Sequence, residues 1–290
     1  MNPFTISYKD TTDIDLIQNA LEGSSVALEK LIKRHQDYIY NIALKMVLNP
    51  FDAEDLTQEV LIKVVTNLSK FKGKSSFRTW VYRITFNHFL KMKQRNTEKA
   101  ITSFENFGHS LDSVVDEELI IQDKIILQEL TKEAKLGCIG GMLLCLDRTQ
   151  RLVFILGEIF DCDHNIGSEL LEISKDNFRK RLERARRDLY NFMNKKCGLI
   201  NKDNPCRCAR KTSGFIKRGW VDKDNMRFNK HYVKSIEATI NEKSEVLEEL
   251  IDEDYGDIHR NGPFQQKEHS VRMFESIFQN EKLRKTFNLN

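Results

Sequence analysis

The chain of 290 residues is 40% hydrophobic and 31% charged and holds only 4 prolines, which is typical of a charge-rich, mostly helical protein with two or three domains. A formal net charge of +3 excludes a protein that binds nucleic acid through its overall charge alone. No apolar run approaches the about 20 residues that a membrane span needs, and residues 1–4 do not begin a signal peptide. We therefore expect a cytoplasmic protein whose 6 cysteines are reduced.

The first two predicted helices span residues 13–33 and 35–48, where apolar residues recur every three or four positions. Gly23 and the two serines that follow it indicate a break inside the first of these helices. Pro50 ends the second, because the residue before a proline avoids helical backbone angles.

A third helix is expected to start at Asp52 or just before it, because acidic residues suit the positive end of a helix dipole. Polar side chains gather near this start, partly exposed: Asp52, Asp55, Gln58 and Glu59. Without further context, the same pattern fits a well-capped surface helix with no binding role.

Residues 70–80 form a predicted basic loop with a glycine, serines and interleaved aromatic residues, and a further helix is expected over 80–95. Cations in such a loop can follow a phosphate backbone, and its aromatic and polar residues can hold an unstacked base. Alternatively, Phe71, Phe77 and Trp80 are ordinary core residues. The candidate nucleic-acid contacts are Lys70, Lys72, Lys74, Ser75, Ser76, Arg78, Trp80, Arg83, Asn87 and Lys91.

The segment 96–118 has the polar composition of a flexible linker. A helix over 119–136 is expected to follow it. Gly137, Gly140 and Gly141 then indicate a break.

Three helical patterns follow one another between residues 146 and 192, and Ser174 is a good N-cap for the third. A short helix, a tight turn and a longer helix is the helix-turn-helix arrangement. Residues 175–187 carry seven basic residues against two acidic ones. Their guanidinium groups can pair with phosphates and with guanine edges in the major groove, although a solvated basic helix is the alternative.

The stretch 197–290 opens with three cysteines within 12 residues. Cys197, Cys206 and Cys208 are candidate zinc ligands with His231 as a fourth, but their spacing is not that of common zinc sites, and reduced, partly buried thiols are the favoured interpretation. Amphipathic helices over 229–255 and 267–287 predict a helical hairpin whose apolar faces could dock another protein.

Two stretches of this sequence resemble the extracytoplasmic-function (ECF) sigma factors of bacterial RNA polymerase. DAEDLTQEVLIKVV and FKGKSSFRTWVYRITFNHFL are similar to region 2 of that family, and LDRTQRLVFILGEI and SKDNFRKRLERARRDL are similar to region 4. The resemblance implies an all-α fold: a region 2 bundle (1–95), a flexible linker (96–118), a region 4 helix-turn-helix domain (119–196) and a C-terminal helical extension (197–290).

The resemblance also implies roles for the candidate residues. The helix that starts near Asp52 would dock on core polymerase through the four polar residues named above. The loop 69–76 would capture a flipped base of the minus-10 element, and the next helix would contact the melting DNA. The implied minus-35 contacts are Lys175, Asn177, Arg179, Lys180, Glu183, Arg184 and Arg187. The expected partners are core polymerase, promoter DNA and, through the extension, an anti-sigma or recruiting protein, with no membrane.

The sequence departs from the family pattern in and before the predicted turn. Glu172 stands where the family usually has glycine, Ser168 where alanine is usual, and Gly167 where a branched apolar residue is usual. Glu172 should therefore adopt a strained turn at a cost of about 1 kcal/mol. The alternative function is a stand-alone, dimeric helix-turn-helix repressor, which would have no use for the region 2 loop. We find no catalytic motif and expect neither an enzyme nor a cofactor beyond the candidate zinc.

Overall fold

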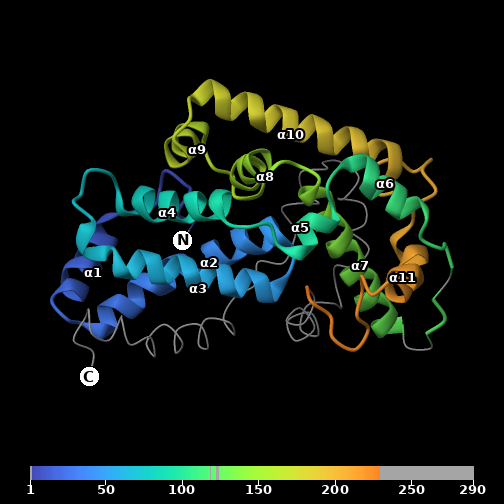
Figure 1. The fold of residues 1–290 in the computed structure, drawn as a ribbon, viewed down its shortest axis with the longest axis horizontal. Coiled ribbons are helices and arrows are strands. Elements are labelled where there is room, and N and C mark those ends of the chain that lie inside the picture. The colour runs from blue at the N-terminus through green and yellow to red at the C-terminus, as the bar shows by residue number, and fades with distance from the viewer. Residues whose placement is uncertain (1, 118, 122–123, 229–290) are drawn as a thin grey trace.

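The computed structural model describes residues 2–117, 119–121 and 124–228. Every regular element in these ranges is a helix, apart from an isolated backbone bridge between Cys197 and Cys206 (Figure 1). The predicted all-α class is therefore confirmed. None of the helices in the described part of the chain is both long and apolar enough to cross a membrane. The hairpin predicted within 229–290 lies outside the described residues.

Four helices form what we call the N-terminal module: α1 (Thr11–Leu21), α2 (Ser25–Val47), α3 (Pro50–Thr66) and α4 (Phe77–Lys91), with the short 3-10 turn η1 (Leu68–Lys70) before α4. Side-chain caps set three of the helix starts. Ser24, Asn49 and Ser76 each accept a hydrogen bond from the first turn of the helix that follows. The predicted break is confirmed at Gly23, whose φ of +102° suits only glycine.

The segment predicted as a flexible linker forms two short helices in its described part, α5 (Asn96–Ala100) and α6 (Phe104–Asp112). Buried side chains anchor each helix to the rest of the protein. Glu98 on α5 is buried, and so are Phe107 and Leu111 on α6. Composition could not reveal these anchors, because they are isolated among polar residues.

The next helix, α7 (Lys124–Leu144), contradicts the break predicted at its three glycines. The helix runs through all three, and at two of them a neighbouring side chain closely approaches the helix backbone. A Cβ atom on Gly140 would lie 2.0 Å from Leu48, and one on Gly141 would lie 2.7 Å from the Phe107 ring. These two glycines therefore mark close packing and do not end the helix.

The helix-turn-helix module comprises α8 (Arg148–Phe154), a π-helical turn η2 (Ile155–Ile159), α9 (His164–Leu171) and α10 (Lys175–Lys196). The three helical patterns predicted for this stretch are confirmed. After it, α11 (Cys208–Lys217) packs against α7. In Figure 1, α10 runs along the upper edge, and α8 and α9 lie between it and the N-terminal module.

The two modules share one hydrophobic core, although the predicted linker suggested separate domains. Buried residues of α1–α4 belong to the same cluster as residues of the helix-turn-helix module: Leu152, Val153, Ile155, Leu156, Phe160, Leu170 and Phe178. A second cluster joins α6, α7, α10 and α11. Ile159 and Leu182 pack against both clusters, so the described helices form one continuous assembly.

Candidate nucleic-acid and polymerase interface

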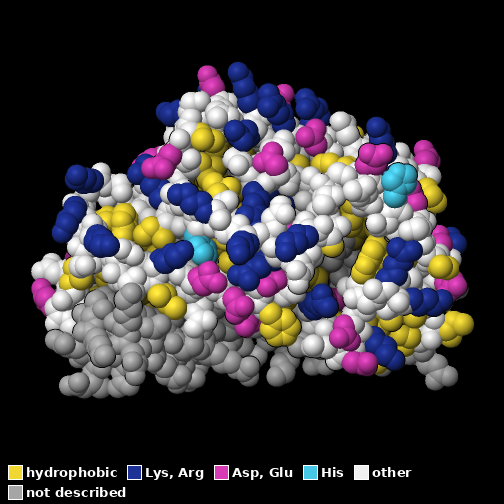
Figure 2. All heavy atoms as spheres, in the orientation of Figure 1, with side chains coloured by type: hydrophobic (Ala, Val, Ile, Leu, Met, Phe, Trp, Pro, Cys, Tyr) yellow, Lys and Arg dark blue, Asp and Glu magenta, His cyan; other side chains and the backbone are white. Residues whose placement is uncertain are grey.

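One side of α10 is buried, so most of its basic side chains point outward. Phe178, Ala185 and Leu189 face the core. Asn177, one of the predicted minus-35 contacts, is half-buried. The other predicted minus-35 contacts lie on the opposite face and are exposed: Lys175, Arg179, Lys180, Glu183, Arg184 and Arg187. Figure 2 shows Lys and Arg side chains gathered along the upper edge, where α10 lies. The helix therefore presents a basic face that can meet a phosphate backbone.

The cations of α10 differ in how firmly they are held. Arg186 donates to the buried Glu158 (2.5 Å), which gives this arginine a structural role. Arg179 pairs with Asp176 (2.7 Å), but both side chains are exposed, so the pair contributes little and can be exchanged for a phosphate. Within the described residues, no acidic side chain pairs with Arg184.

The turn between α9 and α10 has the strained geometry expected from the sequence. Glu172 adopts a left-handed conformation (φ 55°, ψ 40°), and Ser174 caps α10 by accepting from the Asn177 amide (3.2 Å). The departure at Gly167 also has a packing reason. A Cβ atom there would lie 2.4 Å from the Phe178 ring, which fills the space between the two helices.

The predicted minus-10 residues occupy two different environments. Lys70, Lys72 and Lys74 are exposed in and after η1. Ser76 is the N-cap of α4, and its hydroxyl accepts from the Thr79 amide (3.1 Å), so it has a structural role beside any DNA contact. Ser75 in the same loop is half-buried.

An open hollow of about 540 Å³ brings together four of the predicted minus-10 residues: Trp80, Arg83, Asn87 and Lys91. Lys63 of α3 also lines this hollow, and its ammonium lies 2.5 Å from Nδ1 of His88. Burial and the charge of Lys63 lower the pKa of His88, so the neutral ring accepts this hydrogen bond at pH 7. The hollow thus combines three cations with an indole ring, a combination that suits an unstacked base and its phosphate.

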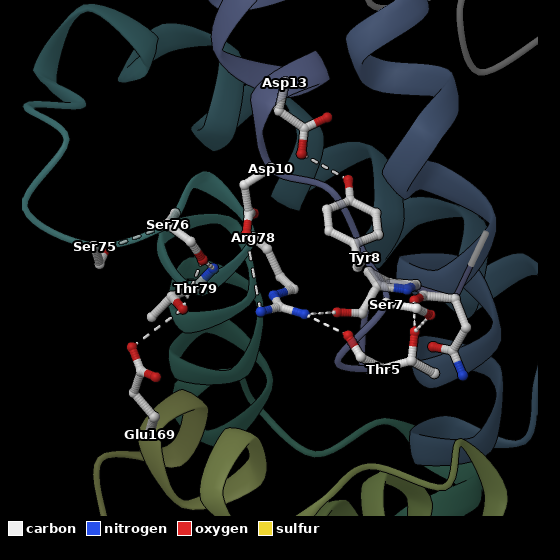
Figure 3. A network of polar contacts seen from close by, with 12 residues as sticks. Thr5, Ser7, Tyr8, Asp10, Asp13, Ser75, Ser76, Arg78, Thr79 and Glu169 are labelled. Atoms are coloured by element: carbon white, nitrogen blue, oxygen red, sulfur yellow. Dashed lines mark hydrogen bonds and ion pairs between the residues drawn. The ribbon is translucent and has the colours of Figure 1, made fainter.

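Two predicted minus-10 arginines are already engaged within the protein (Figure 3 for Arg78). Arg78 donates to the backbone carbonyls of Pro3 (3.0 Å) and Thr5 (2.9 Å). Arg83 donates to the Glu169 carbonyl of α9 (3.2 Å) and lies 3.6 Å from the carboxylate of Glu172. Both guanidinium groups therefore hold other segments of this chain in the described conformation.

The four predicted polymerase contacts lie in the first half of α3. Asp55 and Glu59 are exposed, whereas Asp52 and Gln58 are half-buried. Arg95 lies 3.9 Å from Asp52 and 3.6 Å from Glu59, which ties this acidic face to the start of α5.

Sequence reasoning missed Phe51 and Lys63, which extend these surfaces. Phe51 is 67% exposed in the first turn of α3, beside the acidic face. An exposed aromatic ring next to a polar cluster is typical of a protein-binding surface. Lys63 could not be grouped with α4 from the sequence, because the contact depends on how α3 and α4 pack.

Four cysteines gather between α7 and α11, and one of them was not predicted to belong there. Cys197 pairs with Cys206 in a backbone bridge, and Cys208 begins α11. Burial, together with the neighbouring Cys197 and Cys206 thiols, raises the pKa of Cys208 to about 12. Burial and the neighbouring Cys208 thiol raise the pKa of Cys138 on α7. Among the described residues, no three His, Cys, Asp or Glu side chains are arranged to hold a metal ion. His231 lies outside the described residues.

Comparison with known proteins identifies a matching family model and several relatives. The family model for sigma-70 region 2 matches residues 31–98. The RNA polymerase sigma-H factor of Pseudomonas aeruginosa is 28% identical over 122 residues, 39% of this chain and 63% of the relative. The ECF RNA polymerase sigma factor SigE of Mycolicibacterium smegmatis is 26% identical over 168 residues, 58% and 62% of the two chains. This chain therefore spans somewhat less than two thirds of these two relatives.

Two further comparisons cover more of the partner protein. The ECF RNA polymerase sigma factor SigW of Bacillus subtilis is 24% identical over 177 residues, 60% of this chain and 92% of the relative. A solved structure of CnrH in complex with the cytosolic domain of CnrY aligns with a TM-score of 0.45 at 20% identity, over 63% of this chain and 97% of that one.

Proposed function

This chain belongs to the extracytoplasmic-function sigma factors of the sigma-70 family, and from that premise we propose that it directs bacterial RNA polymerase to promoters in the cytoplasm, without catalysis of its own. One combination supports this proposal most strongly. A region 2 match over 31–98 and a helix-turn-helix with an exposed basic face occur in one chain, in this order. A stand-alone repressor would need only the second of these.

The basic face of α10 is the proposed minus-35 reader. Arg179 and Arg184 are both exposed on α10 and lie about 7.5 Å apart along the helix axis, which is within one stretch of major groove. Guanidinium groups there can bind phosphates or guanine edges. Arg186 pairs with Glu158, so we assign it a structural role and not a DNA contact.

The hollow beside α4 is the proposed site for the minus-10 element. Trp80 offers a stacking surface for a base, and Arg83 and Lys91 offer charge to its phosphates. The exposed lysines of the preceding loop continue this charge along the strand. Asn87, which is exposed at the rim of the hollow, offers an amide for a base edge.

The first half of α3 is the proposed contact with core polymerase. Asp55 and Glu59 provide charge, and Phe51 provides an exposed ring for an apolar pocket of the partner. We also propose a further partner, an anti-sigma or recruiting protein, on the C-terminal extension, of which residues 229–290 lie outside those described.

The test uses a double variant, Arg179→Ala with Arg184→Ala, on a promoter whose start site is first mapped by in vitro transcription with core enzyme. We expect minus-35-dependent transcription to fall by at least about thirtyfold, because each of the two guanidinium contacts contributes about 1–3 kcal/mol. The salt slope of promoter binding should also fall by about two.

Lys195→Ala is the matched control, since Lys195 is exposed on the last turn of the same helix, away from the proposed reader. It should transcribe like the unmodified protein. A pull-down with core polymerase accompanies both variants. If the double variant loses core binding, the assignment of α10 to DNA is wrong, and if the unmodified protein binds no core polymerase, the sigma factor proposal fails.

A further inference from the structure

Four cysteines that the proposed function does not use come together where three helices meet. Cys197 is the C-cap of α10, Cys208 is the first residue of α11, and Cys138 lies on α7, against which α11 packs. A backbone bridge joins Cys206 to Cys197. All four thiols are free, and after the larger effect of burial the other three each raise the pKa of Cys138. The fold thus gathers four sulfur atoms from three separate segments.

The loop between Cys197 and Cys206 is closed tightly on itself. A Cβ atom on Gly198 would lie 2.2 Å from the Cys206 carbonyl oxygen, so only glycine lets the two sides of the loop meet. Nδ2 of Asn204 donates to the Cys197 carbonyl (3.2 Å) and ties the loop to the end of α10. The backbone that carries two of the thiols is therefore held in place by the protein itself.

Backbone amides point at one of these sulfur atoms. Burial raises the pKa of the Cys197 thiol, and hydrogen bonds from the Leu199 and Ile200 amides to its sulfur oppose that rise. Amide donors stabilise the thiolate, which is the form of cysteine that binds a metal ion. The turn after Cys197 is therefore suited to a charged sulfur ligand.

Cations surround the same thiols. Lys135 of α7, Arg207 and Lys211 of α11 each lower the pKa of one or two of the thiols by their positive charge, against the larger effect of burial. One carboxylate, that of Asp116, acts in the opposite direction on Cys206. Four thiolates around a divalent zinc ion carry a net charge of about −2, which such cations offset.

We propose that Cys138, Cys197, Cys206 and Cys208 bind one zinc ion as four thiolates. The sequence offered His231 as the fourth ligand, but the packing of α11 on α7 brings Cys138 to the other three thiols. Four sulfur ligands leave no open coordination position, so the ion has a structural role. Binding releases the thiol protons to water. The inference does not depend on the proposed function, because it involves neither polymerase nor DNA.

Binding requires the cysteine side chains to turn towards the ion. In the described part of the chain, no three of these thiols are arranged around one point. Zn–S bonds of about 2.3 Å place the sulfur atoms of a tetrahedral site about 3.8 Å apart. Rotation about one Cα–Cβ bond moves a cysteine sulfur by up to about 3 Å. The proposal therefore requires rotamer changes at these cysteines.

The ion would anchor the start of the C-terminal extension to the helices that precede it. In turn, α11 holds the segment after α6, because the buried Lys211 donates to the Leu111 (3.3 Å) and Val114 (2.7 Å) carbonyls. Removal of zinc should therefore loosen both α11 and this segment. We expect EDTA to lower the melting temperature of the unmodified protein by about 5 °C or more.

The test uses the purified full-length chain under reducing conditions, with Co²⁺ as the spectroscopic probe after EDTA treatment and desalting. Tetrahedral thiolate coordination gives Co²⁺ strong d–d absorption and a sulfur-to-metal charge-transfer band that grows with the number of thiolates. We expect about one Co²⁺ per chain, with the intensity of four thiolates and full displacement by Zn²⁺. Cys138→Ser should lower the charge-transfer intensity by about a quarter and weaken Zn²⁺ binding at least about tenfold.

Cys145→Ser is the matched control, since Cys145 lies about two turns further along α7 and its thiol donates to the Gly141 carbonyl (3.5 Å). It should bind Co²⁺ like the unmodified protein. His231→Ala should also change nothing. If His231→Ala weakens binding while Cys138→Ser does not, the assignment of Cys138 is wrong.

A folded, reduced, unmodified protein that binds neither Co²⁺ nor Zn²⁺ would overturn the proposal. A Cys197–Cys206 disulfide in protein alkylated directly on cell lysis, detected by mass spectrometry, would overturn it as well. Both outcomes concern the unmodified chain, so they decide the matter even where a serine variant does not fold. A core polymerase pull-down tests the sigma factor function separately, and neither result depends on the other.

Discussion

Glu98 is a buried carboxylate that joins segments far apart in the chain. It accepts hydrogen bonds from Arg148 (2.8 and 3.0 Å) and Arg151 (3.1 Å) of α8 and from the Arg95 amide (3.1 Å). Arg151 in turn donates to the Met46 carbonyl of α2. Burial alone would raise the pKa of Glu98, but the arginine and amide donors outweigh it and lower this pKa below 4.5. The carboxylate is therefore ionised and stabilises the junction of the two modules.

Because the folded state lowers the pKa of Glu98, its stabilisation is present above pH 4.5 and is lost as pH falls through the folded pKa. Glu98→Gln should lower the free energy of unfolding at pH 7 by about 3 kcal/mol or more, since two arginines lose their buried charge partner. It should also make unfolding less sensitive to acid. Urea unfolding at about pH 7 and pH 4 measures both effects.

Glu105→Gln is the control, because Glu105 is exposed on α6. It should leave stability at both pH values within about 0.5 kcal/mol of the unmodified protein. A Glu98→Gln variant that loses as much stability on acidification as the unmodified protein would show that Glu98 contributes nothing to the acid response.

At the scale of elements, α7 shows how packing decides what a glycine means. Gly137 and Gly140 lie on one helix, three residues apart. A Cβ atom on Gly137 would lie 3.7 Å from the nearest heavy atom, in the Phe228 ring, which is ordinary contact. A Cβ atom on Gly140 would lie 2.0 Å from the Leu48 side chain, which would have to move.

The two alanine substitutions should therefore have opposite signs. Gly137→Ala should raise the free energy of unfolding by up to about 1 kcal/mol, the difference in helix propensity between glycine and alanine. Gly140→Ala should lower it by about 1–3 kcal/mol, because Leu48 must leave its position in a packed interface. Denaturant unfolding of the two variants measures the difference. Equal effects of the two substitutions would mean that Leu48 does not pack tightly there.

The hydrophobic clusters of the described residues cross the predicted domain boundaries. Trp80 packs against the cluster that unites the N-terminal and helix-turn-helix modules. The Trp220 ring contacts Phe215 of the other cluster in a tilted arrangement (5.3 Å between centroids). These are the only 2 tryptophans in the sequence. Each therefore reports on one half of the assembly.

Shared cores predict a single cooperative unfolding transition. Trp80→Phe and Trp220→Phe variants each leave one fluorescent reporter, and their urea midpoints should agree after correction for any change in overall stability measured by circular dichroism. Two transitions, with the Trp220 reporter unfolding separately, would show that the two hydrophobic clusters unfold independently.

Most of the helices were predicted from local sequence patterns. The helix-turn-helix emerged from the periodicity of α9 and α10 and from Ser174, and the strained turn from Glu172, all within a short stretch of sequence. The acidic face of α3 and the basic face of α10 could also be predicted from the sequence, because helix periodicity determines which residues lie on the same side of a helix. The DNA and polymerase contacts themselves stay predictions.

Features that depend on residues far apart in the chain could not be predicted from local patterns. The break predicted in α7 was wrong because Leu48 and Phe107, which explain the glycines, come from other helices. The segment 96–118 resembled a flexible linker because Glu98 is one acidic residue among many until Arg148 and Arg151 meet it. Lys63 joined the hollow beside α4 only through the packing of α3 on α4.

The sequence by itself therefore determined the helical class, the family and the surfaces that carry charge, because each of these follows from residues close together in the chain. The tertiary structure alone decided that the two modules share a core, that Phe4 lies between them and that Arg83 faces α9. Those contacts join residues up to 158 positions apart, and such pairings cannot be predicted from periodicity or from a local motif.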